Sequence, residues 1–286
     1  MLPRVLGFSH TGKSEAAILL LWFITTSAGA ATRTTIVTEI IRDDNSEKRT
    51  DVFTVDGQQA RLDMYGEDTS VNLAPYMLTI DGGKTWYLSE PKDKKTVCTQ
   101  WDTRDFFKGV GELVHYAQEL VGAEVKDGPV DVTLDESGPK LHGYNTRHLK
   151  LSYSLNAVAW ILVIKREYSL EFQDEVWVSP ELKLSDIEQV WFDAMSETGY
   201  IKLDRLSKKW NQKVNGTVIK MISDVTLHNV TKNEKRHKQE RMEITKQEIL
   251  KSSDIPAETF KVPACKNVSK DEMEEAAKDM LKGIAR

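Results

Sequence analysis

Short segments of alternating apolar and polar residues, separated by tight turns, fill residues 34–101. In one of them Ala60, Leu62 and Met64 alternate with polar residues. A period of two is typical of half-buried β-strands. The preceding Asp56-Gly57 is a dipeptide that favours two-residue hairpin turns. This part of the chain therefore predicts an antiparallel meander with short connections.

A second strand signal, EFQDEVWVSPEL at residues 171–182, turns into a helix signal. Phe172, Val176 and Val178 share one face of the predicted strand. Pro180 ends the ladder because proline has no N–H group. Trp177 stands at this corner as a structural residue. The adjacent carboxylates of Asp174 and Glu175 point to opposite faces of a strand, so they are not expected to share one substrate.

Three segments have the period of amphipathic helices. The segment after Thr103 carries an apolar stripe of Phe106, Val110, Leu113, Val114, Ala117, Leu120 and Val121. The segment at 185–196 begins with a capping box, Ser185 and Glu188, and its stripe is Ile187, Val190, Trp191, Ala194 and Met195. The segment at 269–286 predicts a tail helix with an apolar side of Met273, Ala276, Ala277, Met280, Leu281 and Ile284. We expect an α+β fold, a curved antiparallel sheet with helices over its concave face, plus this tail helix.

The first thirty residues differ from the rest of the chain. Arg4 and Lys13 precede an apolar run at 16–24, and small residues follow up to Ala30. This order is typical of a secretory signal peptide cleaved after Ala30. The alternative is an uncleaved anchor, but the run is short for a bilayer, which needs about 20 residues. The expected organisation is a signal peptide at 1–30, one domain at 31–268 and the tail helix, exported to the periplasm or the extracellular space.

Two cysteines, Cys98 and Cys265, remain in the domain. In an oxidising compartment they can form one disulfide. Two separate buried thiols are an equally good interpretation of the sequence.

Composition and motifs exclude several classes of function. The net charge of −5 argues against a nucleic-acid partner, which would need a basic face. None of the six histidines lies in a zinc-binding pattern, and His142 and His148 have no carboxylate partner in the sequence nearby. Nucleophile, phosphate-binding and dinucleotide-binding motifs are absent from the sequence. No metal, cofactor or catalytic residue is therefore expected.

An apolar run at 157–164 has two interpretations. It is a buried or paired strand, or it is an apolar hairpin at the rim that contacts lipid, a ligand or a partner. The second interpretation makes Trp160, Ile161 and Leu162 contact residues for a membrane surface or an envelope protein.

Five motifs occur in an order that resembles a known family. They are QARLD at 59–63, IDGGKTWY at 80–87, GYNT at 143–146, EVWVSPEL at 175–182 and FKVP at 260–263. Together they are similar to exported bacterial proteins of a domain-of-unknown-function family related to the lipoprotein-carrier (LolA/LolB-like) fold. The resemblance implies a half-barrel whose cavity holds acyl chains, and it implies no catalytic residues. The chain departs from the family in the run at 157–164 and in Cys265, where glycine is more usual.

The leading functional hypothesis is a non-catalytic exported protein that binds lipid or another apolar ligand in a half-barrel cavity. The expected cavity residues are Phe106, Val110, Leu113, Ile187, Val190 and Trp191. The alternative is an envelope structural or interaction module whose half-barrel is filled by its own side chains. An enzyme ranks below both because no catalytic set is present in the sequence.

Overall fold

A computed structural model describes residues 30–42, 45–66, 74–92, 95–120, 124–161, 164–182 and 185–267. The predicted signal sequence, apart from Ala30, and the predicted tail helix lie outside the described residues. Both therefore remain predictions. No helix in the described ranges is both long enough and apolar enough to cross a membrane.

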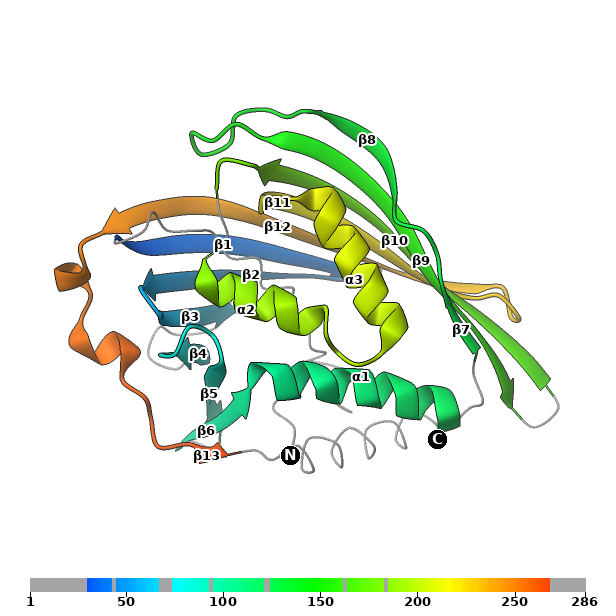
Figure 1. Cartoon of the computed structure of the whole chain (residues 1–286), viewed down its shortest axis with the longest axis horizontal. Helices are drawn as coiled ribbons and strands as arrows, with labels where there is room; N and C mark the ends of the chain where they lie inside the picture. The colour runs from blue at the N-terminus through cyan, green and yellow to red at the C-terminus, as the bar shows by residue number, and fades with distance from the viewer. Residues whose placement is uncertain are drawn as a thin grey trace.

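One large sheet forms the body of the protein (Figure 1). Its thirteen strands, counted over the described residues, are β1 (Ala31–Arg42), β2 (Asn45–Asp56), β3 (Gln59–Gly66), β4 (Tyr76–Thr79), β5 (Thr85–Lys92), β6 (Lys95–Asp102), β7 (Glu124–Asp127), β8 (Asp131–Ser137), β9 (Arg147–Ile161), β10 (Ile164–Ser179), β11 (Thr217–Asn229), β12 (Glu234–Leu250) and β13 (Lys266–Asn267). The strand order is β13-β6-β5-β4-β3-β2-β1-β12-β11-β10-β9-β7, and β8 also pairs with β9. Strands β1 to β6 are the predicted meander, which is confirmed.

The sheet arches over three α-helices in the described chain, α1 (Thr103–Leu120), α2 (Asp186–Met195) and α3 (Ile201–Val214) (Figure 1). Register irregularities interrupt the pairing at Thr35/Ile36 and at Trp177/Val178. Such bulges bend a strand and increase its twist, which helps a sheet to curve. The expected combination of a curved antiparallel sheet and covering helices is confirmed at this level. That the chain belongs to the lipoprotein-carrier family remains a prediction.

The strand register sorts the side chains into rows across the sheet. One row runs over six strands and consists of Thr34, Phe53, Leu62, Met77, Leu88 and Thr99. Its apolar members join the core cluster that contains Ile187 and Trp191 of α2. This row therefore faces the helices. A second cluster contains apolar residues of the five strands β8, β9, β10, β11 and β12, together with Ile36 of β1. These residues pack against Phe192 of α2 and the buried side of α3.

The sequence locates α2 correctly but does not reveal α3. The Ser185 hydroxyl accepts the Glu188 N–H at 3.3 Å, and the Glu188 carboxylate accepts the Ser185 N–H, so the predicted capping box is present. Helix α3 was not predicted, although Leu206, Trp210 and Val214 follow at a spacing of four and are its buried residues.

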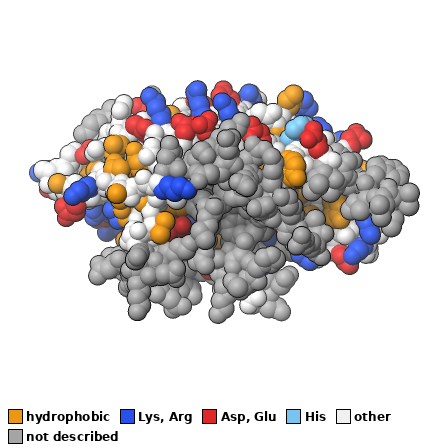
Figure 2. Space-filling model, turned by 90° about the horizontal axis from the view of Figure 1, so that it is seen from below, with side chains coloured by type: hydrophobic (Ala, Val, Ile, Leu, Met, Phe, Trp, Pro, Cys, Tyr) orange, Lys and Arg blue, Asp and Glu red, His pale blue; other side chains and the backbone are white. Residues whose placement is uncertain are grey.

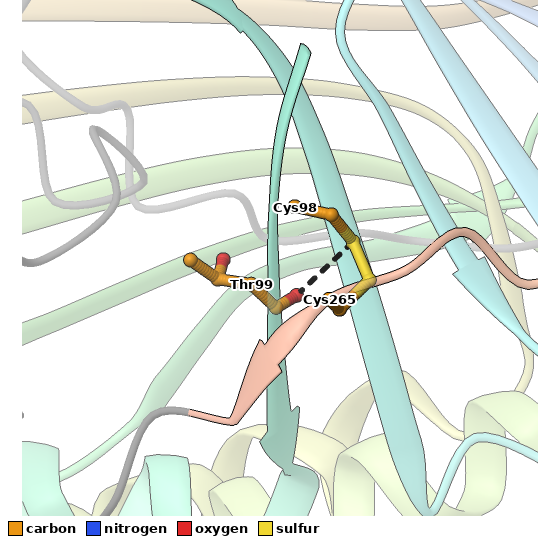
Figure 3. Close-up of a disulfide and its surroundings, with 3 residues drawn as sticks. All are labelled: Cys98, Thr99 and Cys265. Carbon is orange, nitrogen blue, oxygen red and sulfur yellow. Dashed lines mark hydrogen bonds between the residues drawn. A yellow bond between two sulfur atoms is a disulfide. The ribbon is translucent and has the colours of Figure 1, made fainter.

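The disulfide between Cys98 and Cys265 is present, so the alternative of two separate thiols is wrong (Figure 3). The two Cα atoms lie 4.5 Å apart. After β12 the chain forms two short 3-10 helices, Ser252–Asp254 and Ala257–Phe260, and then reaches β13. The disulfide and the pairing of β13 with β6 fix this returning segment to the far end of the meander.

The apolar run at 157–164 is not one strand. Its residues end β9 at Ile161 and begin β10 at Ile164, and Ile161 pairs with Ile164. Residues 157–161 are thus a paired strand, as the first interpretation has it, and their pairing with β10 forms the hairpin of the second. The side chains of Trp160 and Ile161, and all of Leu162, lie outside the described residues, so their contact with a membrane or a partner stays a prediction.

Candidate binding site in the helical layer

Three of the six predicted cavity residues meet in one aromatic cluster. Phe106 of α1 and Trp191 of α2 both pack against Trp101 of β6, with ring centroids 4.8 and 5.8 Å away. Trp191 also lies edge-on to Trp86 at 5.7 Å, and Ile187 belongs to the same cluster. Such aromatic pairs contribute about 0.5–1.5 kcal/mol each beyond the area they bury.

The side chains in this cluster are packed against one another. Trp86 and Ile187 are 0% exposed and Trp191 is 4% exposed. The space between α2 and strands β5 and β6 is therefore occupied by side chains of the protein itself. The apolar stripes of the two helices indicate the helical half of this cluster. They do not indicate its contacts with Trp86 and Trp101, because a strand pattern does not show which helix will cover it.

The other three predicted cavity residues are half-buried. Val190 lies on α2, and Val110 and Leu113 lie on α1. Val110 and Leu113 belong to neither of the two core clusters of the described chain. Helix α1 instead approaches the turn after α2. The approach is so close that a Cβ atom at Gly111 would lie only 2.2 Å from the carbonyl oxygen of Thr198. Glycine thus permits close contact with that turn rather than with the sheet.

Glu188 is a buried carboxyl group beside this cluster. It is 0% exposed, and one of its oxygens accepts the Ser185 N–H in the capping box. Within the described part of the chain, its Oε1 has no hydrogen-bond partner, and neither have the indole Nε1 atoms of Trp101 and Trp191. Burial raises the pKa of Glu188 to about 8, against the opposing hydrogen bonds from Ser185. At neutral pH this side chain is therefore mostly protonated.

Asp174 forms a polar network on the inner side of the sheet. Its Oδ2 accepts hydrogen bonds from Tyr153 Oη at 2.7 Å and from Trp210 Nε1 at 2.9 Å. Its Oδ1 accepts one from Ser223 at 2.6 Å. Burial raises the pKa of Asp174, although these bonds oppose the shift. The three donors lie on α3, β9 and β11, so the network joins α3 to β9, β10 and β11.

Asp174 and Glu175 lie on opposite faces of β10, as predicted. Glu175 faces outward, and its Oε1 lies 2.7 Å from His148 Nε2 and 3.3 Å from Lys150 Nζ. The His148 Nδ1 atom lies 3.1 Å from Glu136 Oε1. The expectation that His148 has no carboxylate partner is therefore wrong, because Glu136 and Glu175 belong to the two strands beside it. No group of three or more ligating side chains suited to a metal ion occurs within the described ranges.

A groove of about 360 Å³ lies between α2 and α3. Its apolar lining is Phe192, Trp210 and Val214, and its polar lining is Gln189, Asp193, Ser196, Glu197, Lys208, Asn211, Gln212 and Asn215, with Gly216. A smaller set of α3 residues, from Ile201 to Gln212, lines a neighbouring hollow of about 400 Å³. None of the six predicted cavity residues lines either hollow. The sequence does not indicate this groove, because one of its walls is α3, a helix that was not predicted.

Charges of both signs share the surface. On the described part of the face in Figure 2, acidic and basic side chains lie intermixed along one edge. This mixture agrees with the small net charge of −5. An extended basic face for nucleic acid is not seen on that part of the surface.

Comparisons with known proteins assign no family to the chain. No family model and no curated protein matches it. Among solved structures, a structure of PNGF-II matches with a TM-score of 0.31 and 13% identity, over 88% of this chain and 33% of that one. The MucA/MucB complex of Pseudomonas aeruginosa matches with a TM-score of 0.30 and 12% identity, over 82% of this chain and 56% of that one.

A DUF1329 family protein from Desulfovibrio piger matches with a TM-score of 0.28 and 5% identity, over 82% of this chain and 91% of that one. The chain thus spans about a third of PNGF-II and about half of the MucA/MucB chain. With TM-scores near 0.3, these matches assign neither a fold family nor a function to the chain.

Proposed function

We propose that this chain is an exported, non-catalytic binding module whose interior is filled by its own side chains. It binds a protein partner through the groove between α2 and α3. The observation that carries the proposal is the close packing of Trp86, Trp101 and Trp191 beneath α2, where a ligand cavity was expected. The disulfide agrees with export, because such bonds persist in oxidising compartments.

The groove has the layout of a protein interface. An apolar floor of Phe192, Trp210 and Val214 is bordered by amide and charged side chains of both signs. Protein interfaces commonly combine an apolar centre with a polar rim. Asp174, a buried carboxylate bonded to the groove residue Trp210, has both oxygens engaged in hydrogen bonds that hold α3, which supports a binding role over a catalytic one.

The test combines native mass spectrometry with site-specific photo-crosslinking in the producing cell. The purified protein is expected to have the mass of the polypeptide alone. A crosslinker at Gln212, on the groove, is expected to give one discrete protein adduct, and a crosslinker at the exposed Thr245 on β12 is expected to give none. A co-purified lipid mass, or no adduct specific to Gln212, contradicts the proposal.

A second candidate is an apolar ligand, such as a lipid, held between the sheet and the helices. It is favoured by three polar atoms of this apolar interior that find no hydrogen-bond partner among the described residues: Oε1 of Glu188 and the Nε1 atoms of Trp101 and Trp191. A buried polar group without a partner costs about 1–3 kcal/mol, so a ligand that supplied polar atoms there would gain free energy. Binding would require α2 to move away from Trp86 and Trp101.

Tryptophan fluorescence distinguishes the two candidates. Titration with a brominated fatty acid quenches Trp86, Trp101 and Trp191 if the ligand enters the cluster. Saturable quenching that disappears in an Ile187→Asp variant supports the second candidate. Quenching no greater than that of a free tryptophan derivative supports the self-filled interior.

A further inference from the structure

Helix α3 is basic in a chain that is acidic as a whole. Its fourteen residues include five basic ones and one acidic one, while the chain has a net charge of −5. The basic residues are Lys202, Arg205, Lys208, Lys209 and Lys213. The acidic residue, Asp204, is directed towards the turn before the helix. There its Oδ1 accepts hydrogen bonds from the N–H and the hydroxyl of Thr198 at 2.8 and 2.6 Å. Asp204 thus stabilises the start of α3, and the helix keeps an excess of basic side chains.

Strand β7 neutralises part of this positive charge. The Nη1 atom of Arg205 lies 3.3 Å from Oδ1 of Asp127, and Lys209 Nζ lies 3.7 Å from Oδ2 of the same residue. One carboxylate therefore serves two cations. Lys208 forms no ion pair with any residue that the structure describes. Positive charge thus remains on the outer side of α3.

The exposed residues of α3 form one stripe beside the groove between α2 and α3. Four exposed residues follow one another at intervals of four, three and four positions, which places them on one side of the helix. We refer to them as the basic stripe, and they are Ile201, Arg205, Lys208 and Gln212. All four line the hollow next to the groove, and Lys208 and Gln212 also line the groove itself. A partner in the groove therefore also meets the basic stripe.

The apolar floor of the groove suits a peptide better than a flat surface. Phe192 and Trp210 are each 7% exposed, and Val214 is 2% exposed. A bilayer surface makes little contact with residues so little exposed, whereas a single peptide side chain can enter between the helices.

The two walls of the groove differ in charge. The α2 side carries the carboxylates of Asp193 and Glu197, and the α3 side carries the ammonium group of Lys208. Like charges that face each other across an interface are costly, while opposite charges favour binding. A bound chain is therefore favoured when its acidic side chains lie towards α3.

We propose that the partner in this groove binds through an acidic peptide segment, whose carboxylates contact Arg205 and Lys208 of the basic stripe. One apolar side chain of the segment covers Phe192 and Trp210. This inference rests on the proposed function, in which a protein occupies the groove. Complementary charge speeds the encounter and disfavours partners of the wrong sign, so the basic stripe selects acidic partners.

Charge reversal in the full chain tests this selection in the producing cell. The photo-crosslinker is placed at Gln189, on the α2 wall, so that the basic stripe stays intact. Lys208→Glu is expected to lower the yield of the protein adduct about tenfold or more, because it sets a carboxylate against the acidic segment. The control is Lys235→Glu, an equal change of charge at an exposed position of β12, and it is expected to leave the yield unchanged.

The outcomes separate this inference from the proposed function. An adduct of equal yield in Lys208→Glu and the parent protein overturns the acidic segment and leaves the groove with a protein partner. The absence of an adduct from the parent protein overturns both.

The adduct itself gives a second measurement. Mass spectrometry of the crosslinked peptide is expected to find more acidic than basic residues beside the crosslink. Changing the acidic residue nearest the crosslink to lysine in the partner is expected to restore the adduct of Lys208→Glu. A neutral or basic peptide, or a failure of this reversal to restore the adduct, contradicts the proposal.

Vesicle sedimentation distinguishes an acidic peptide from an anionic membrane. The purified full chain is mixed with vesicles of phosphatidylglycerol or of phosphatidylcholine and centrifuged. It is expected to stay in the supernatant with both. Sedimentation with phosphatidylglycerol that Lys208→Glu abolishes and Lys235→Glu retains would assign the basic stripe to a lipid surface and overturn the proposal.

Discussion

The indole Nε1 of Trp210 on α3 donates a hydrogen bond of 2.9 Å to Oδ2 of Asp174 on β10. Asp174 is 4% exposed and Trp210 is 7% exposed, so the bond lies inside the protein. It joins a helix that the sequence did not reveal to the strand that the sequence identified most clearly. The same carboxylate accepts hydrogen bonds from the hydroxyl groups of Tyr153 and Ser223. A single residue thereby connects α3 to three neighbouring strands.

Trp210→Phe is expected to destabilise the protein by about 1–3 kcal/mol. The variant retains an aromatic ring in the core but removes one donor from a buried carboxylate. Urea unfolding measures the loss. In an Asp174→Asn background the same substitution is expected to cost less, because the acceptor is no longer charged. Equal losses in both backgrounds would show that ring packing, and not the hydrogen bond, connects α3 to the sheet.

Glu188 is expected to make stability depend on pH. Its pKa of about 8 in the folded protein exceeds the ordinary value of 4.5, so the folded state binds more protons between these values. The contribution of Glu188 to the stability of the fold is therefore greatest below pH 4.5 and falls as the pH rises towards 8. Because the group is fully buried, the loss is on the order of 4 kcal/mol. Glu188→Gln, whose amide oxygen can still accept the Ser185 N–H, is expected to flatten this dependence.

Chemical denaturation of both proteins at pH 5, 6, 7 and 8 measures the effect. The matched control is Glu197→Gln, which removes an exposed carboxylate after the end of the same helix. The control is expected to retain the fall in stability. A parallel pH profile for Glu188→Gln and the parent protein would show that this carboxyl group is not the cause.

Trp177 and Trp191 are expected to contribute unequally to stability. Trp177, which the sequence marks as a structural residue at the end of the strand, is half-buried on the outer face and stacked on His148, with ring centroids 4.6 Å apart. Trp191 is in the aromatic cluster. Trp191→Ala is expected to cost about 3–5 kcal/mol and Trp177→Ala about 1 kcal/mol. Unfolding in guanidinium compares them, and a larger loss at Trp177 would contradict the assignment of the core.

Local sequence patterns predict the strands and the capped helix because their causes are local. The alternation in β3 and the capping box of Ser185 and Glu188 each depend on residues a few positions apart. The partners of Asp174 and His148 come from strands and helices distant in the sequence, and no spacing shows them. Helix α3 was missed because its apolar stripe is narrow, with Leu206, Trp210 and Val214 among mostly polar residues. The groove between α2 and α3 was not predicted either, because α3 forms one of its walls.

Removal of the disulfide is expected to cost about 5 kcal/mol. The bond closes a loop between positions 167 residues apart, and the entropic stabilisation of such a bond grows slowly with loop length. The double variant Cys98→Ser, Cys265→Ser removes it without leaving a free thiol. Thermal unfolding in the absence of reductant compares the variant with the parent protein. Since the bond also holds β13 against β6, hydrogen exchange at residues 266–267 is expected to rise more than exchange at β10, which lies far along the strand order. A loss of stability without this local difference would indicate that the disulfide acts on the unfolded chain alone and does not anchor the C-terminal segment.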